Sequence, residues 1–181
     1  MPAFCGSSFL KLRKILLLAL VLSRISAGLW AQENSTRQAI ALKVIDGDTL
    51  ITEKGEHIRL IGVDAPEYQP HKNKIQVYGK ESGEFLRKRI EGKPIRLETD
   101  TELYDRYGRT LAYVYDAQGK LINGEIIAEG YARSRAYPPN LRHLEEFNED
   151  QLQARRAQKG LWDRRIGSSF RTWLDNLMGR D

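Results

Sequence analysis

The pattern of apolar and polar residues after position 39 predicts five short strands separated by turns. Apolar side chains alternate with other residues from Ile40 to Ile45, and an extended pattern resumes from Thr49 to Thr52 after an Asp46-Gly47 turn. Further strands are predicted over the ranges 58–63, 95–99 and 110–115. Short turns between successive strands favour mainly antiparallel pairing.

Helical spacing of apolar residues is found only later in the chain. It predicts helices over the ranges 75–90, 121–129 and 141–159, whereas the polar stretch 68–74 is predicted to be an exposed loop. Five short strands in the first two-thirds of the chain, with helices inserted late, are typical of a small closed barrel with helices packed on it, and the five-stranded oligonucleotide/oligosaccharide-binding (OB) barrel fits best. The predicted class is an α+β fold dominated by β.

A basic and then apolar segment begins the chain. Lys11, Arg13 and Lys14 precede eight apolar residues, 15–22, and small residues follow as far as Ala31. This order is typical of a secretory signal peptide, and the apolar run is much shorter than the roughly 20 residues that span a bilayer. A retained anchor is therefore the weaker alternative. We predict an exported protein, either secreted or located in the periplasm or cell envelope.

Removing the predicted signal peptide changes the charge of the protein. The full chain of 181 residues has a formal charge of +5, and removing the four basic side chains of residues 1–31 leaves +1. A strongly basic protein would attract nucleic acid through its bulk charge, so this chain must rely on local recognition instead. The only cysteine, Cys5, also lies in this segment, and the mature domain must fold without disulfides.

The chain divides into a predicted core domain and its extensions. The segments are a signal peptide at 1–31, a polar leader at 32–38, the folded domain at 39–163 and a C-terminal extension at 164–181. In the extension, Phe170, Trp173, Leu174 and Leu177 follow helical spacing. We expect this amphipathic stretch to pack on the domain. A membrane-surface or partner helix is less favoured, because its polar face is not richly basic.

Two acidic stretches stand at the ends of predicted strands. Asp46, Asp48, Asp64 and Glu67 fall within 22 residues and have strongly apolar neighbours. Burying charges of one sign is costly unless a cation or hydrogen bonds compensate them. Hard oxygen ligands favour Ca²⁺ or Mg²⁺. Taken singly, Asp46 is better explained by a hairpin turn and Asp64 by the end of a strand than by metal binding.

Two arginines suggest an anion beside the expected cation. Arg59 lies between apolar residues in a predicted strand, where it needs either a bound anion or a salt bridge to one of the acids. Arg109 closes a polar loop immediately before another strand. Two guanidinium groups opposite a divalent ion suit the charge that builds on a phosphodiester during hydrolysis. Glu67 is suited to orienting or deprotonating the attacking water.

Three motifs, in this order and with similar separations, resemble the staphylococcal (micrococcal, or thermo-) nuclease family. They are Asp46–Thr49, Arg59–Glu67 and Asp105–Val114, and the resemblance extends from Ile40 to Trp162. It implies a five-stranded OB-fold barrel with three packed helices. It also implies a monomeric enzyme, with no stable protein partner, that hydrolyses DNA and RNA with one Ca²⁺ per site and leaves 3′-phosphate and 5′-hydroxyl ends.

The resemblance implies roles for individual residues. The direct calcium ligands would be Asp48, Asp64 and the carbonyl of Ala65, while Asp46 and Glu67 would act on the ion through water. Ala65 stands where the staphylococcal enzyme has threonine, but a carbonyl ligand does not depend on the side chain.

Catalysis and substrate binding are implied for a second set. Arg59 and Arg109 would stabilise the transition state and Glu67 would be the candidate general base. The expected substrate-binding residues are Arg106, Tyr107, Tyr137 and Lys72. The family's pair of tyrosines after the second helix is reduced here to Tyr137, which follows Arg133 and Arg135.

Two other functions are compatible with the same fold. A catalytically silent OB-fold module that binds nucleic acid is the main alternative, because binding is a common use of this barrel. A calcium-binding module with structural arginines is the second. The complete set of acids and arginines favours the enzyme.

Overall fold

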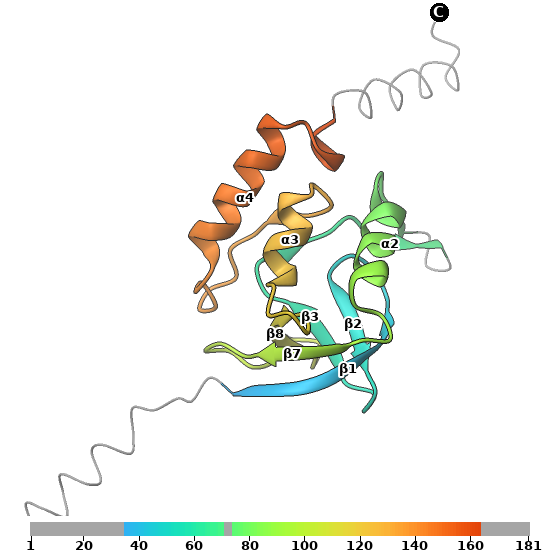
Figure 1. The fold of residues 1–181 in the computed structure, drawn as a ribbon, viewed down its shortest axis with the longest axis vertical. Helices are drawn as coiled ribbons and strands as arrows, with labels where there is room; N and C mark the ends of the chain where they lie inside the picture. The colour runs from blue at the N-terminus through green and yellow to red at the C-terminus, as the bar shows by residue number, and fades with distance from the viewer. Residues whose placement is uncertain (1–34, 71–73, 164–181) are drawn as a thin grey trace, which may run out of the picture. The chain divides into compact units, whose positions relative to one another are not determined.

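The computed structural model describes residues 35–70 and 74–163, which form a five-stranded closed barrel covered by three helices (Figure 1). The strands are β1 (Thr36–Val44), β2 (Thr49–Thr52), β3 (His57–Leu60), β4 (Val63–Asp64), β5 (Tyr68–Gln69), β6 (Lys74–Ile75), β7 (Pro94–Glu98), β8 (Thr110–Tyr115) and β9 (Arg133–Ser134). The helices are α2 (Gly79–Ile90), α3 (Ile122–Ala128) and α4 (Leu144–Arg156), followed by a short 3₁₀ turn, η2 (Gly160–Trp162). The predicted signal peptide, Lys72 and the C-terminal extension lie outside the described residues.

The barrel closes in the strand order β1-β2-β3-β8-β7. All neighbouring strands are antiparallel except β3 and β8, which are parallel. The predicted fold class and the mainly antiparallel pairing are therefore confirmed. The first strand begins at Thr36 rather than Ile40, so the end of the expected polar leader belongs to the barrel. Residues 36–38 pair through their backbones with residues 96–98 of β7, and this pairing does not depend on apolar side chains.

The predicted strand over 58–63 is broken in two. Gly62 adopts a positive φ of 76°, and a Cβ at this position would lie 2.6 Å from the ring of Phe147 on α4. A glycine is therefore required both by the backbone conformation and by the close approach of the helix. After this break β4 leaves the barrel and pairs with β9. This pairing places Asp64 of β4 beside Arg133 of β9.

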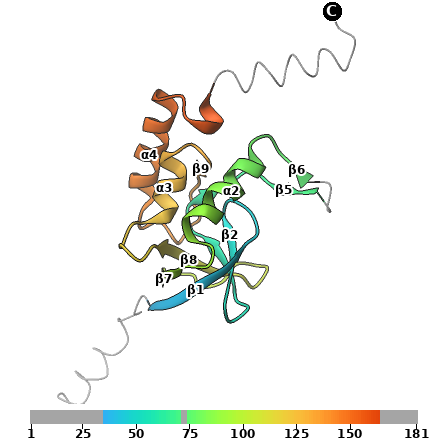
Figure 2. The ribbon, with the colours of Figure 1, turned by 45° about the vertical axis from the view of Figure 1, so that its right-hand side comes forward.

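The start of the first helix differs from the prediction. Lys74 and Ile75 pair with Gln69 and Tyr68 as the strands β6 and β5, so the expected exposed loop is partly a hairpin (Figure 2). Tyr78 has a φ of 72°, which is not helical, and α2 begins only at Gly79. None of the helices in the described ranges is both long and apolar enough to cross a membrane.

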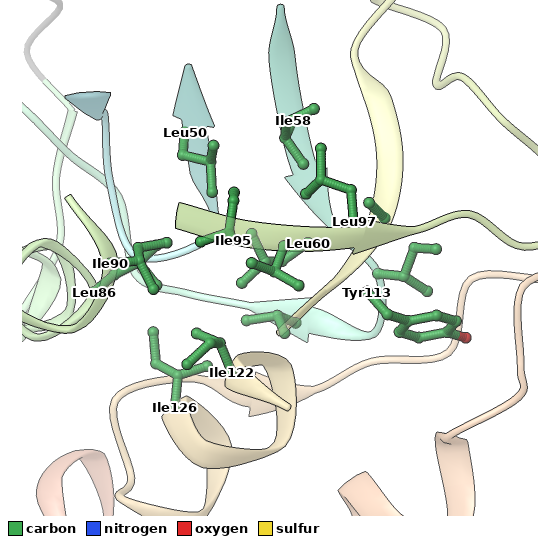
Figure 3. Close-up of a cluster of buried hydrophobic side chains, with 14 of the residues drawn as sticks. Leu50, Ile58, Leu60, Leu86, Ile90, Ile95, Leu97, Tyr113, Ile122 and Ile126 are labelled. Carbon is green, nitrogen blue, oxygen red and sulfur yellow. The ribbon is translucent and has the colours of Figure 1, made fainter. Parts of the chain in front are cut away.

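The core lies between the barrel and the helices. In Figures 1 and 2, α3 lies between α2 and α4 on one side of the barrel. Figure 3 shows that Leu86 and Ile90 of α2 and Ile122 of α3 point toward Leu60 and Ile95 of the barrel. All these side chains are buried. This continuous apolar core fixes the strand ends that carry the acidic stretches.

Asn123 is a buried polar residue that joins α3 to the barrel. Its Nδ2 donates to the carbonyls of Ile61 (2.9 Å) and Ala112 (3.3 Å), and its Oδ1 accepts from the backbone N–H of Val114 at 2.8 Å. Replacing Asn123 with alanine leaves these backbone groups without their partner. We expect Asn123→Ala to lower the free energy of unfolding by about 2–3 kcal/mol in a urea titration. The exposed variant Gln118→Ala should change it by less than about 0.5 kcal/mol, and equal effects would contradict this account.

Candidate active site

One cleft of about 740 Å³ brings together nearly all the predicted site residues that the structure describes. Its lining includes Asp48, Arg59, Asp64, Ala65, Glu67, Arg106, Tyr107, Arg109 and Tyr137. Asp46 does not line the cleft; its carboxylate Oδ1 accepts the backbone N–H of Asp48 at 3.2 Å and it is only 6% exposed. The two acidic stretches and both arginines thus converge although they are separated by up to 63 positions in the sequence (46 to 109).

Asp48 is the most deeply buried acid of the cleft, with 7% of its surface exposed. Its Oδ2 accepts the backbone N–H of Ala65 at 3.0 Å and lies 3.0 Å from Nη1 of Arg59. Burial raises the pKa of Asp48 to about 7; the guanidinium of Arg59 opposes this rise, whereas the nearby carboxylate of Asp46 adds to it. A negative charge is therefore costly here in the protein alone, and a cation near Asp48 would stabilise it.

Arg59 on β3 lines the cleft, with Asp48 and Tyr137 as neighbours. Besides its ion pair with Asp48, its Nη1 donates to the carbonyl of Leu60 at 3.3 Å. Its Nη2 approaches the hydroxyl of Tyr137 at 3.5 Å, and the guanidinium lies 5.9 Å from the centre of that ring. The salt bridge expected as one explanation of Arg59 is present. Although Arg59 lines the cleft, only 11% of its side-chain surface is exposed.

Arg109 is held by a carboxylate within its own loop. Its backbone N–H and its Nε donate to Oδ1 and Oδ2 of Asp105 at 2.9 and 2.7 Å. Burial favours the neutral form of Asp105, but the hydrogen bonds from Arg109 and Tyr107 hold the pKa of this carboxyl below its ordinary value. Asp105 therefore remains ionised and fixes the direction of the Arg109 guanidinium.

The hydroxyl of Thr49 connects the two sides of the cleft. It donates to Oδ1 of Asp48 at 3.0 Å and accepts from Nη1 of Arg109 at 3.3 Å. A chain of polar contacts consequently runs from Asp105 through Arg109, Thr49 and Asp48 to Arg59. This chain links both guanidinium groups to the buried acid, so a displacement of one member would be felt by the others.

Asp64 and Glu67 lie on the segment that follows the break at Gly62. Oδ1 of Asp64 is 3.5 Å from Nη1 of Arg135. Glu67 is held through its backbone: its N–H donates to Oε1 of Gln76 at 3.0 Å, and its carbonyl accepts the N–H of Gln76 at 2.8 Å. This reciprocal pair fixes the position from which the Glu67 side chain enters the cleft.

Two tyrosines stand at the cleft with guanidinium groups near their rings. The ring centre of Tyr137 is 5.9 Å from the guanidinium of Arg59 and 5.6 Å from that of Arg135. Tyr107, which is 69% exposed, has Arg106 at 4.8 Å and Arg109 at 5.5 Å from its ring centre. Exposed aromatic rings beside fixed positive charges are suited to nucleobases and phosphates.

The chemistry of the donor set agrees with a hard divalent cation that keeps several waters. Within residues 35–70 and 74–163, no three acidic, histidine or cysteine side chains lie close enough to hold a metal ion on their own. Asp48, Asp64 and the carbonyl of Ala65 provide a few oxygens at the same cleft, and the cost of ionising buried Asp48 calls for a cation. Because Ca²⁺ takes six to eight oxygens, water and substrate would have to supply the remainder.

The charges that line the cleft are balanced. Five acids and five arginines face it: Asp48, Asp64, Glu67, Glu102, Asp105, Arg59, Arg106, Arg109, Arg133 and Arg135. A bound divalent cation would therefore make the net charge of the cleft positive, and a positive cleft would attract an anionic phosphodiester. The same balance argues against strong sequence-independent binding of nucleic acid by the protein alone.

Several supporting residues were not predicted from the sequence. Gln76 and Thr49 carry no sign of their roles beyond their polarity, and Asn140 at the cleft edge bonds in both directions with the backbone of Glu102 at 2.8 Å. Asp105 could have been identified, since an aspartate two residues before a Tyr-Gly turn commonly accepts backbone N–H groups.

The first turn of α2 packs directly on the Glu67 segment. A Cβ on Gly79 would lie 2.5 Å from the carbonyl oxygen of Glu67 and 3.0 Å from that of Pro66. Neither backbone group can yield without moving the segment. We therefore expect Gly79→Ala to lower kcat for phosphodiester hydrolysis at least about tenfold by displacing Glu67, measured with single-stranded DNA.

Gly83, one turn later on the same helix, provides the matched control. A Cβ there would lie 3.6 Å from Cα of Asp46, an ordinary contact distance. Gly83→Ala should keep kcat within about twofold and raise the free energy of unfolding by up to about 1 kcal/mol, because alanine favours helix. A similar loss of kcat in both variants would contradict the specific role of Gly79.

Comparison with known proteins identifies similar chains. Residues 57–164 match the family described as "Staphylococcal nuclease homologue". The chain is 39% identical over 140 residues to the thermonuclease of Staphylococcus hyicus, an alignment that covers 76% of this chain and 81% of that protein. It is 41% identical over 125 residues to the thermonuclease of Staphylococcus intermedius, covering 67% and 74% of the two chains. Endonuclease YncB of Bacillus subtilis (strain 168) is 31% identical over 127 residues, covering 67% and 60%.

Proposed function

Because the chain belongs to the staphylococcal nuclease family and is a nuclease hydrolase, we propose that it is an exported enzyme that cuts DNA and RNA with Ca²⁺. The products carry 3′-phosphate and 5′-hydroxyl ends. The observation that carries this proposal is the convergence of two guanidinium groups and a buried acid in one cleft: Arg59 and Arg109 are linked through Asp48 and Thr49.

The arginines bind and stabilise the phosphate. Arg59, fixed on β3, and Arg109, fixed by Asp105, offer planar forks to the oxygens of a phosphodiester from two separate elements. Charge that builds on the equatorial oxygens during attack is then met by donors already in place. The bound Ca²⁺ would supply further charge neutralisation at the phosphate, held by Asp48, Asp64 and the Ala65 carbonyl, with Asp46 and Glu67 acting through water.

Glu67 is the proposed general base. It lines the same cleft as both arginines, and its backbone is fixed by the reciprocal hydrogen bonds with Gln76. From this position its carboxylate orients an attacking water and accepts the proton as the bond to phosphorus forms. The 5′-oxygen leaves as the phosphate remains on the 3′ side, with Arg109 near the leaving group.

Tyrosines and neighbouring arginines hold the substrate strand. Tyr107 with Arg106, and Tyr137 with Arg135, offer rings and guanidinium groups at the edges of the cleft. Stacking of bases on such rings is tolerant of sequence, which suits an enzyme without strong base specificity. Lys72 is a further proposed phosphate contact. The enzyme acts as a monomer.

Export and domain limits form part of the same proposal. The order of basic, apolar and small residues within 1–31 supports a signal peptide. The proposed nuclease domain spans residues 39–163, and the barrel strand β1 extends it toward the N-terminus as far as Thr36. A catalytically silent binding module is the alternative function. The balanced charge of the cleft favours turnover over tight binding.

Analysis of the product ends tests this proposal. A 3′-labelled and a 5′-labelled single strand, of DNA and of RNA, should both be cut in the presence of Ca²⁺. The new 3′ ends should resist extension by a polymerase until a phosphatase has removed the terminal phosphate. Products with free 3′-hydroxyls would contradict the proposed direction of bond cleavage, and intact substrates in every condition would favour the binding module.

A further inference from the structure

A second cleft of about 640 Å³ lies beside the candidate active site and meets it at two residues. Tyr107 and Arg109 line both clefts, whereas His57, Tyr104 and Thr110 line only the second. Its volume lies within the range of roughly 300–1,000 Å³ that is usual for small-molecule sites. The second cleft is therefore large enough for a group of nucleotide size and shares two lining residues with the first.

The second cleft presents exposed aromatic rings on a well-fixed backbone. Tyr104 is 58% exposed and Tyr107 is 69% exposed, and His57 is also exposed. Tyr104 forms an antiparallel bridge with Thr110, and the N–H of Asp105 donates to the carbonyl of Arg109 at 3.0 Å. Large rings held open to solvent in this way provide flat surfaces for stacking at little cost in ordering.

The sheet register connects the two clefts. His57 and Arg59 occupy alternate positions on β3, and both side chains are directed away from the buried residues Ile58 and Leu60. In the parallel pairing of β3 with β8, Ile58 lies opposite Thr110, so His57 is level with Arg109. One side of β3 thus leads from Arg59 in the first cleft to His57 in the second.

The acid of the second cleft does not repel a polyanion, because its charge is compensated. Oε1 of Glu56 accepts from the hydroxyl of Thr110 at 2.6 Å, and its Oε2 forms an ion pair with Arg37. Arg109, whose Nε is held by Asp105 at 2.7 Å, presents its guanidinium where the clefts meet. A phosphodiester backbone that passes from one cleft to the other can therefore be met by guanidinium donors at this boundary.

We propose that the second cleft binds an additional nucleotide of the single-stranded substrate, with its base against Tyr104 and Tyr107 and its phosphate at Arg109. The proposal rests on the proposed function, because it extends the strand that occupies the first cleft. It predicts that longer strands are better substrates than a dinucleotide, and that Tyr104 provides much of the difference. Loss of one stacked base would weaken binding about tenfold.

Substrate length separates this site from the candidate active site. We would measure kcat and KM for a dinucleotide and for a single-stranded octanucleotide with wild type, Tyr104→Ala, Tyr104→Phe and Leu42→Ala. Tyr104→Ala should raise KM for the octanucleotide about tenfold and leave the dinucleotide within about twofold. Tyr104→Phe keeps the ring and should resemble wild type. Leu42→Ala is the control. It removes an exposed apolar side chain on β1, away from both clefts, and should leave the kinetic constants for both substrates unchanged.

A binding measurement keeps the proposal testable without turnover. Fluorescence anisotropy of a labelled octanucleotide, with a chelator present, should show about tenfold weaker binding by Tyr104→Ala and unchanged binding by Leu42→Ala. Equal binding by wild type and Tyr104→Ala, or equal kinetic losses on short and long substrates, would overturn the proposal. If wild type cleaves nothing but Tyr104→Ala still binds more weakly, the proposed function fails while the second cleft stands as a nucleic-acid site.

Discussion

Arg109→Ala should lower kcat for single-stranded DNA by two to three orders of magnitude while the protein remains folded. The guanidinium is fixed by Asp105 at 2.7 Å and Thr49 at 3.3 Å, and it is linked to buried Asp48 through the Thr49 hydroxyl rather than by a direct ion pair. Its loss therefore removes a preorganised donor for the transition state and little packing. The measurement is steady-state kinetics together with a urea unfolding curve for each variant.

Two further variants test whether the loss of activity is specific to the guanidinium of Arg109 in the cleft. Arg109→Lys keeps the charge but loses the planar fork, and it should recover only part of the lost activity. Arg87→Ala, on the exposed face of α2 and paired with Glu91, removes an arginine from outside the cleft and should stay within about twofold of wild type. Near-full activity of Arg109→Ala would mean that its role is wrongly assigned.

Asp48→Asn should have opposite effects on activity and stability. The pKa of Asp48 is raised by burial from 3.8 to about 7, so the folded protein is penalised for ionising this group. When the pKa of an acid is higher in the folded state than in the unfolded state, the folded protein loses stability as the pH rises from the unfolded-state pKa through the folded-state pKa. In a chelator at pH 8, the variant should therefore gain about 1–3 kcal/mol in free energy of unfolding. With Ca²⁺ present, its kcat should be at least about a hundredfold lower than that of wild type.

The pH dependence of stability provides the measurement for this second variant. Between about pH 4 and pH 7, wild type should lose stability relative to Asp48→Asn, and the difference should level off above that range. Lower stability of Asp48→Asn throughout the range would contradict the burial argument.

The barrel could be predicted from the sequence because its strands are short, apolar-rich runs between turns, with alternation clearest in β3 and β7. The strand over 110–115 and the strand over 49–52 have the predicted limits, and both are largely buried. The start of β1 was not predicted, since Thr36 to Gln38 are polar and pair only through the backbone. Strand pairing of this kind leaves no apolar pattern to detect.

The first helix shows where helical spacing is misleading. Ile75, Val77 and Tyr78 continue the apolar spacing of α2 toward the N-terminus, but Ile75 pairs with Tyr68 and Tyr78 adopts a left-handed φ. Strand pairing within the β5–β6 hairpin overrides the helical periodicity at this point. The consequence is functional, because the same turn brings Gln76 to the backbone of Glu67.

The candidate site could be predicted in its charged members but not in their supports. Acids and arginines in apolar surroundings signal a need for partners, and Asp48, Arg59 and Arg109 do lie together at one cleft. The contributions of Thr49, Gln76 and Asp105 depend on loop conformations that bring a hydroxyl, an amide and a carboxylate within hydrogen-bonding distance. Their polar side chains alone give no such information.

The most direct test of the central claim is cleavage of single-stranded DNA by the purified protein with Ca²⁺ and with a chelator. The proposed site predicts rapid cleavage with Ca²⁺, a rate at least about a hundredfold lower in chelator, and full recovery when excess Ca²⁺ is restored. Asp48→Asn should remain slow in all three conditions. Equal rates with and without chelator, or no cleavage by wild type in any condition, would contradict a calcium-dependent nuclease.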